Sequence, residues 1–275
     1  MARLECGDYT FIGESVAGTG TVMVVKELKL CFDLGTLVPA ALATTNVFIS
    51  HGHTDHCGEL FNYLGIRALE QRGLATLYVA PDLAHHIKEL LDRWQQMSNS
   101  VFDYRIVQCF PGAPLPLKNN IAVTAFPLAH SPPTSGFLVE ETVQKLMPQY
   151  NTLPAYEIIN RKKEGEENLF YKLVRPLLAF LPDTLPEGLD EAPEAVWKAR
   201  VLALEATFLD DRKPMAKVRA GRHLHLDDII ARLDRFEGEY LLLFHFSKIY
   251  TEEEIRTIVF SRVPSSYHDR IRLFL

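Results

Sequence analysis

Three histidines and one aspartate fall within six consecutive residues, His51-Gly52-His53-Thr54-Asp55-His56. The segment follows directly on residues 46–50, an apolar run that predicts a short buried strand. A loop leaving a strand end can turn alternate residues to one side, so His51 and His53 can share one cation while Asp55 and His56 reach a second. Neutral imidazole and carboxylate are ligands that zinc and similar divalent metals prefer. A histidine-rich surface loop would need three of the chain's ten histidines to gather there by chance.

The composition is that of an ordinary globular protein. The chain has 275 residues, 47% of them hydrophobic, and a formal net charge of -6, which gives no overall attraction to nucleic acid or to an anionic membrane. The four cysteines are widely spaced without a CxxC pair, which favours free thiols in a reducing compartment. The N-terminus lacks a secretory hydrophobic region, and no stretch is long enough to span a bilayer. We therefore expect a cytoplasmic protein.

Strand and helix patterns alternate along the chain, with strands in both halves. Short apolar runs predict strands at residues 21–25, 28–32, 46–50, 77–80, 105–109, 121–126, 177–181, 201–204, 240–244 and 271–275. Helical patterns occupy residues 59–72 and 226–236, a helix opens at Pro81-Asp82, and another follows the capping box that starts at Thr251. The first strands follow one another without helices, which favours a four-layer αββα sandwich of the α/β (α+β) class over a doubly wound sheet. We expect one domain over residues 1–275.

The H-x-H-x-D-H pattern after a strand resembles the signature of the metallo-β-lactamase superfamily. Later segments match the order of motifs in that superfamily: Ala129-His130, Leu181-Pro182-Asp183-Thr184 and Phe244-His245. The resemblance implies that His51, His53 and His130 hold one metal and that Asp55, His56 and His245 hold the other. Asp183 would be shared between them. Each of the last three could instead be an ordinary polar residue at a strand end.

The C-terminal third is similar to the tRNase Z-like branch of this superfamily. The segment Glu205-Ala206-Thr207 resembles the Glu-Ala-Thr motif of that branch, and His223 falls where the branch has its His-Ser-Thr motif at a helix start. His225 competes with His223 for that position. The segment His245-Phe246-Ser247 with Tyr250 is similar to the final motif of the branch.

The resemblance also implies the chemistry. Two divalent metals, Zn²⁺ first with Mn²⁺ or Fe as alternatives, would hold a hydroxide nucleophile between them, and Asp55 could accept the proton of the attacking water. His223 would protonate the leaving oxygen as a general acid, and Glu205 would orient it. The expected enzyme is a metal-dependent phosphodiesterase with a tRNase Z-like active site. The expected substrate is RNA or a smaller phosphodiester, and the protein is expected to form a homodimer.

Two departures from the branch leave alternatives open. Lys248 and Ile249 stand where the branch has an arginine before Tyr250, and only 52 residues separate His130 from Asp183. We expect so short a segment to leave little room for the protruding arm that grips tRNA in that family. The basic cluster at residues 161–163 is diluted by neighbouring acids and is interpreted as a solvated loop. A thioester, ester or lactone hydrolase on the same fold, or a metal-bound binding protein without catalysis, stays possible on the sequence.

Overall fold

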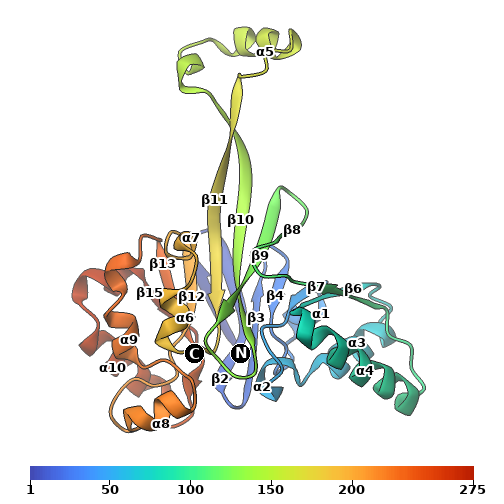
Figure 1. Cartoon of the computed structure of the whole chain (residues 1–275), viewed down its shortest axis with the longest axis vertical. Coiled ribbons are helices and arrows are strands. Elements are labelled where there is room, and N and C mark those ends of the chain that lie inside the picture. The colour runs from blue at the N-terminus through green and yellow to red at the C-terminus, as the bar shows by residue number, and fades with distance from the viewer.

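The computed structural model describes all 275 residues and places two β-sheets face to face between outer layers of helices (Figure 1). The strands of the first sheet lie in chain order from β1 to β7, and β14 pairs with β2. Their bounds are β1 Ala2–Cys6, β2 Tyr9–Ala17, β3 Gly20–Val25, β4 Leu30–Phe32, β5 Asn46–Phe48, β6 Ala75–Val79, β7 Tyr104–Gln108 and β14 Phe246–Ser247.

The second sheet has the order β15-β13-β12-β11-β10-β9-β8. Its strands are β8 Pro114–Pro116, β9 Ile121–Leu128, β10 Thr134–Leu146, β11 Phe170–Leu181, β12 Val201–Glu205, β13 Tyr240–Phe244 and β15 Ile271–Leu273. The three strands β11, β12 and β13 are parallel neighbours, so their carboxyl ends lie at the same edge of the sheet. The strand expected at residues 271–275 is β15, which lies at the edge of the sheet.

Helices cover the outer face of each sheet and confirm the four-layer αββα arrangement. The first sheet packs against α1 Pro39–Leu42, α3 Leu60–Leu69 and α4 Pro81–Ser98. The second packs against α6 Pro186–Asp190, α7 Glu194–Trp197, α9 Leu226–Ile230 and α10 Glu252–Arg262. None of the helices combines the length and the apolar composition needed to cross a membrane.

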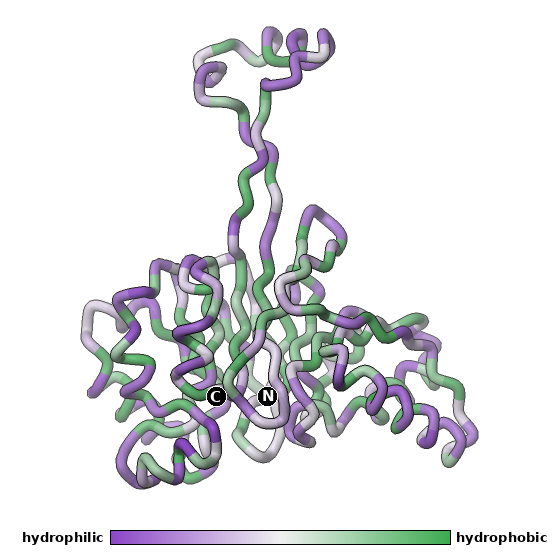
Figure 2. The backbone as a smooth tube through the Cα atoms, in the orientation of Figure 1, coloured by the Kyte–Doolittle hydropathy of each residue, from purple (hydrophilic) through white to green (hydrophobic).

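Aromatic side chains fill the space between the two sheets. Phe32 of the first sheet stacks on Phe180 of the second with ring centroids 4.8 Å apart, and Phe180 stacks in turn on Phe244 at 5.1 Å. These side chains belong to a cluster of buried residues drawn from both sheets, which Figure 2 shows as hydrophobic strands at the centre of the molecule. Burying one phenylalanine side chain stabilises a fold by roughly 1.5–3 kcal/mol, so this interface fixes the two sheets, and the strand ends that carry the site, relative to each other.

A two-stranded arm projects from the second sheet, and the expectation that the segment is too short for one is wrong. Strands β10 and β11 stay paired as far as Leu146 and Phe170, and the helix α5 Ala155–Lys163 lies at the tip (Figure 1). The basic residues 161–163 form the last turn of α5 and not a loop. Strand β10 begins at Thr134, next to the loop that follows β5. The arm lies at the other end of β10 and therefore points away from that loop.

The sequence predictions match some strands closely and miss others. Strand β13 has the predicted bounds, whereas β1, β2 and the long β10 were not predicted. The helix predicted at residues 226–236 ends at Ile230 and gives way to a 3₁₀ turn at Leu233–Arg235.

Candidate metal centre

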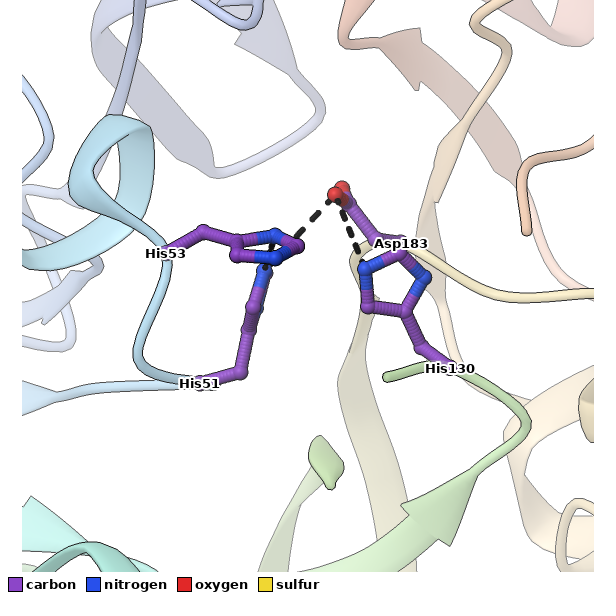
Figure 3. A group of neighbouring side chains, drawn as sticks. All are labelled: His51, His53, His130 and Asp183. Atoms are coloured by element: carbon purple, nitrogen blue, oxygen red, sulfur yellow. Dashed lines mark hydrogen bonds and ion pairs between the residues drawn. The ribbon is translucent and has the colours of Figure 1, made fainter. Parts of the chain in front are cut away.

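Side chains from four parts of the chain converge at one edge of the two sheets. His51, His53, His130 and Asp183 form one group that could hold a metal ion, and Asp55, His56 and His245 form a second. Within each group the ligand atoms lie within 4.8 Å of one another. Figure 3 shows the first group, in which the imidazoles and the carboxylate of Asp183 face a common space. The structure therefore brings together all seven residues that the sequence suggested as ligands.

Asp183 stands between the two groups and presents one oxygen to each. Its Oδ2 lies 3.7 Å from His51 Nε2 and 3.8 Å from His130 Nε2. Its Oδ1 lies 3.4 Å from His56 Nε2 and 3.3 Å from His245 Nδ1. A carboxylate in this position can coordinate one cation through each oxygen.

The backbone of the loop after β5 is held close to the loop after β4. A Cβ on Gly35 would lie 1.7 Å from the carbonyl oxygen of Asp55, so only glycine allows this approach. The main chain of Leu34 also donates a hydrogen bond to the carbonyl of His56 at 2.7 Å. The contact fixes α2 (Thr54–Cys57), and with it Asp55 and His56, against the first sheet.

Two buried polar atoms at the centre lack a hydrogen-bond partner, and this is the observation that tests whether cations fit. His130 Nε2 and Asp183 Oδ1 are both buried without one. An unpaired buried polar atom is costly, and such atoms usually mark a bound ion or water. A divalent cation would satisfy both atoms, so the residues present fit metal ions.

Partners outside the cluster hold the second nitrogen of most of the imidazoles. His56 Nδ1 lies 2.7 Å from Asp33 Oδ2, and His130 Nδ1 lies 2.9 Å from the carbonyl oxygen of Arg222. His51 Nδ1 lies 3.0 Å from Ser50 Oγ, and His245 Nδ1 lies 3.0 Å from Thr207 Oγ1. The two acceptors that cannot donate, at His56 and His130, require Nδ1–H and turn Nε2 toward the centre, where it can bind a cation when the ring is neutral.

Burial and neighbouring charges shift the pKa values of the clustered side chains in different directions. Burial, with the neighbouring His56, lowers the pKa of His51 to about 2, so this imidazole is neutral and able to coordinate. Burial also opposes the charge of His56, but the carboxylates of Asp183 and Asp33 outweigh it and raise its pKa well above the usual value. Burial would raise the pKa of Asp183, yet the charges of His245 and His56 hold it well below its usual range. The carboxylate is thus ionised and ready to bind a cation.

Asp33 is the residue of the centre that sequence reasoning missed. Its buried carboxylate accepts hydrogen bonds from Ser50 N at 2.8 Å and Ser50 Oγ at 2.9 Å, besides its contact with His56. It therefore orients a histidine of each group, His56 directly and His51 through Ser50. In the sequence it is a lone aspartate after the strand predicted at residues 28–32, and no local pattern indicates which residues will lie beside it. Its φ of 60° lies in the left-handed region that non-glycine residues seldom adopt, a strain common at functional sites.

Replacing this carboxylate tests its supporting role. We expect Asp33→Asn to weaken metal binding by roughly 10–100-fold, because the amide no longer fixes the tautomer of His56. Competition against a chelator would measure the affinity. The matched control is Asp103→Asn, which changes an exposed aspartate in the same way and should leave the affinity unchanged. Equal affinities for the two variants would contradict this role.

Glu205 and His223, which the sequence suggested as a general acid and its orienting carboxylate, lie beside Asp183. His223 Nδ1 is 3.3 Å from Glu205 Oε1 and 3.9 Å from Asp183 Oδ2. The fully buried Glu205 also accepts hydrogen bonds from the backbone of Thr184 and Leu224, at 3.0 and 3.1 Å. Burial disfavours the charged form of His223, but Glu205 outweighs it and raises the pKa of His223 to about 9. His223 therefore carries a proton at neutral pH.

Thr207 connects this pair to the metal cluster. Its hydroxyl lies 2.5 Å from Glu205 Oε2 and 3.0 Å from His245 Nδ1. Because a hydroxyl has one proton, the geometry lets Thr207 donate to Glu205 while it accepts from His245. Glu205 thus orients both His223 and a histidine of the cluster.

Two other side chains near the site, His225 and Cys57, have structural roles. His225 is the N-cap of α9 and accepts a hydrogen bond from Asp227 N at 3.2 Å, so its Nδ1 is engaged away from the cluster. Cys57 donates to the carbonyl of His53 at 3.3 Å, and burial raises the pKa of its thiol to about 11, which disfavours a thiolate ligand. All four cysteines are free, as predicted.

Asp55 contacts the turn between β2 and β3. Its Oδ2 accepts a hydrogen bond from Gly18 N at 2.7 Å, and the same oxygen lies 3.6 Å from His245 Nε2. Burial would raise the pKa of Asp55, but His245 and His56 together lower it, so the carboxylate is ionised. Its position fits either a ligand or a proton acceptor.

The fold and the site together define a metal-dependent hydrolase of the metallo-β-lactamase type. The model of the beta-lactamase superfamily domain matches residues 36–246. Similar proteins include tRNase Z TRZ1 of Arabidopsis thaliana, which is 31% identical over 269 residues that cover 98% of this chain and 95% of the relative. The chloroplastic tRNase Z TRZ2 of the same plant is 32% identical over 93% of this chain and 72% of its own length. The chain belongs to the beta-lactamase superfamily, in its tRNase Z-like branch.

A solved structure supports the fold. The human tRNase Z, short form, superposes with a TM-score of 0.60 and covers 87% of this chain and 92% of its own. Its sequence is 19% identical, so the comparison shows a shared fold.

Proposed function

We propose that this protein is a dinuclear zinc phosphodiesterase that cleaves RNA of the tRNA type, as the names of its relatives describe for them. The proposal rests on the position of Asp183, whose two oxygens face two separate groups of imidazoles. Its Oδ2 also lies 3.9 Å from His223 Nδ1. A thioester hydrolase releases a thiolate, which leaves without a proton, whereas the ribose oxygen released from a phosphodiester needs one. The Glu205–His223 pair therefore favours phosphodiester cleavage.

The seven clustered side chains would hold the metals as two sets that share Asp183. Zn²⁺ suits the mixture of imidazole and carboxylate, and Mn²⁺ or Fe could occupy the same ligands. Bound there, the metals supply a water of lowered pKa and polarise a phosphoryl oxygen.

The protein's own groups would move the protons. Asp55, ionised and next to His245, would accept the proton of the attacking water. His223 carries a proton at neutral pH and would donate it to the leaving oxygen. Glu205 would keep the imidazole of His223 oriented through the 3.3 Å contact with Nδ1.

The arm favours a macromolecular substrate. From Thr134 to Leu146, β10 spans roughly 40 Å at about 3.3 Å per residue, so a small diester bound at the metals could not also touch α5 of the same chain. Lys162 and Lys163 are exposed on α5, and neither has a carboxylate within ion-pair distance, in contrast to Arg161, which pairs with Glu157 and Glu166. These lysines are free to contact phosphates.

Deleting the arm separates RNA cleavage from the chemistry. Replacing residues 141–175 by Asn-Gly joins Glu140 to its partner Pro176 through a two-residue hairpin turn and removes only the pair Glu141–Ile121 between β10 and β9. We expect kcat/KM on a tRNA precursor to fall on the order of 10²-fold, because a second contact site on a polymer adds that much avidity. Hydrolysis of bis(p-nitrophenyl) phosphate should stay unchanged.

A shorter deletion shows which part of the arm matters. Replacing residues 147–169 by Asn-Gly keeps the paired strands up to Leu146 and Phe170 and removes only the tip. If the tip binds RNA, both deletions should lose RNA cleavage equally. Unchanged RNA cleavage in the longer deletion would refute the proposed role of the arm.

We also propose that the protein forms a homodimer. A second copy of the chain is the partner we expect, because apolar side chains are exposed on and beside the helices α3 and α4. These are Leu69, Leu90, Trp94, Met97 and Val101. A cytoplasmic location and a single domain over residues 1–275 complete the proposal.

A further inference from the structure

The segment before His223 is positively charged, although the chain as a whole is acidic. Residues 212–222 contain five basic residues and no acidic one, although the whole chain has a net charge of -6. Helix α8 (Met215–Ala220) lies within this segment. Because His223 directly follows the segment, its charge is concentrated at the rim of the metal centre.

Two of the five cations are neutralised by carboxylates. Arg219 makes a bidentate contact with Asp228 at 2.8 and 2.6 Å, and Arg212 pairs with Asp210 at 3.0 Å and Glu254 at 2.7 Å. The other three have no carboxylate within 4.0 Å, and these are Lys213, Lys217 and Arg222. Lys213 Nζ lies 5.6 Å from the ring centroid of Phe208, which is itself 6.2 Å from the ring centroid of His223.

Arg222 is the best placed of the three. It immediately precedes His223, its side chain is exposed, and its carbonyl oxygen accepts the hydrogen bond from His130 Nδ1 at 2.9 Å. That bond ties its backbone to the metal cluster. The backbone that carries the guanidinium is therefore fixed by its contact with His130 and by its bond to His223.

The backbone of Arg222 is strained. Its φ of 57° lies in the left-handed region, where glycine is the residue that fits without steric cost. Replacing Arg222 by glycine would therefore remove the side chain without straining the backbone. Arginine is suited to phosphate because its planar group donates two parallel hydrogen bonds and stays charged.

We propose that Arg222 binds a backbone phosphate of the RNA next to the scissile bond, with Lys213 and Lys217 extending the same cationic rim. The inference rests on the proposed RNA cleavage and adds a specificity residue to it. Arg222 does not touch the reacting atoms; it raises affinity for a polyanion over a single diester. Loss of this contact should raise KM for RNA and leave kcat nearly unchanged.

Arg222→Gly tests the idea without endangering the fold. Glycine relieves the strained φ, so Tm should be unchanged or higher. KM for RNA should rise about 10-fold, and the salt dependence of log(kcat/KM) should become shallower by about 0.7–0.9, the value for one lost phosphate contact. Arg222→Lys should restore part of the RNA affinity.

Lys29→Gly is the matched control. Lys29 is also an exposed cation with a left-handed φ of 55°, but it lies in the turn between β3 and β4. It should change neither KM nor the salt dependence. If wild-type protein cleaves RNA and Arg222→Gly behaves like Lys29→Gly, the inference is wrong while the proposed function stands. If the wild type cleaves no RNA, both are wrong.

Discussion

Asp183→Asn should remove about one of two metal ions per chain and lower kcat on the order of 10³-fold or more, since the protein then loses both the shared ligand and the activated water. The physical reason is the position of the carboxylate, with Oδ2 3.7 Å from His51 Nε2 and Oδ1 3.4 Å from His56 Nε2. An amide offers one oxygen and a nitrogen that repels cations, so it can serve only one group. Elemental analysis of purified protein, together with kcat on bis(p-nitrophenyl) phosphate, would measure both effects.

Asp190→Asn is the control for this substitution. Asp190 is an exposed aspartate that pairs with Arg232 at 2.6 Å on the surface of the second sheet's helices. Metal content and kcat should both stay at wild-type values in this variant. An Asp183→Asn protein that keeps two ions per chain and normal turnover would exclude a shared carboxylate.

His223→Ala should lower kcat on RNA by roughly 10²–10⁴-fold while the metal content stays unchanged. The imidazole is protonated at neutral pH because Glu205 raises its pKa to about 9, so it can supply the proton that the leaving ribose oxygen needs. A p-nitrophenolate leaves without protonation. Turnover of bis(p-nitrophenyl) phosphate should therefore fall far less, and the contrast between the two substrates identifies a general acid.

His86→Ala provides the comparison, because His86 is an exposed histidine on α4. It should leave both rates unchanged. Equal losses on the two substrates in His223→Ala would contradict a proton donor and would point to a role in holding the cluster together, through the 3.9 Å contact with Asp183.

The candidate site was more predictable than the fold around it. Four of the clustered residues lie within six consecutive positions, and the remaining three follow strand ends. Local patterns and a family resemblance were therefore enough to suggest them. Asp33 could not be found in this way. Its role depends on Ser50 and His56, which are 17 and 23 residues away and become its neighbours only in the folded sheet.

The arm escaped prediction for a different physical reason. Strand β10 changes from buried residues at Thr134–Val139 to partly exposed ones beyond, so its outer half carries no hydrophobic alternation. The number of residues was also misleading, since a chain in extended strands covers about 3.3 Å per residue and needs few residues to reach far. Strand β13, buried on both faces, shows the opposite case and was predicted with its observed bounds.

The most direct test of the central claim is anomalous diffraction at the zinc absorption edge from a crystal of the zinc-loaded protein. We predict two separate anomalous peaks on either side of Asp183, one among His51, His53 and His130 and the other among Asp55, His56 and His245. A single peak, or peaks away from these side chains, would contradict a pair of metal ions held together at this edge of the sheets.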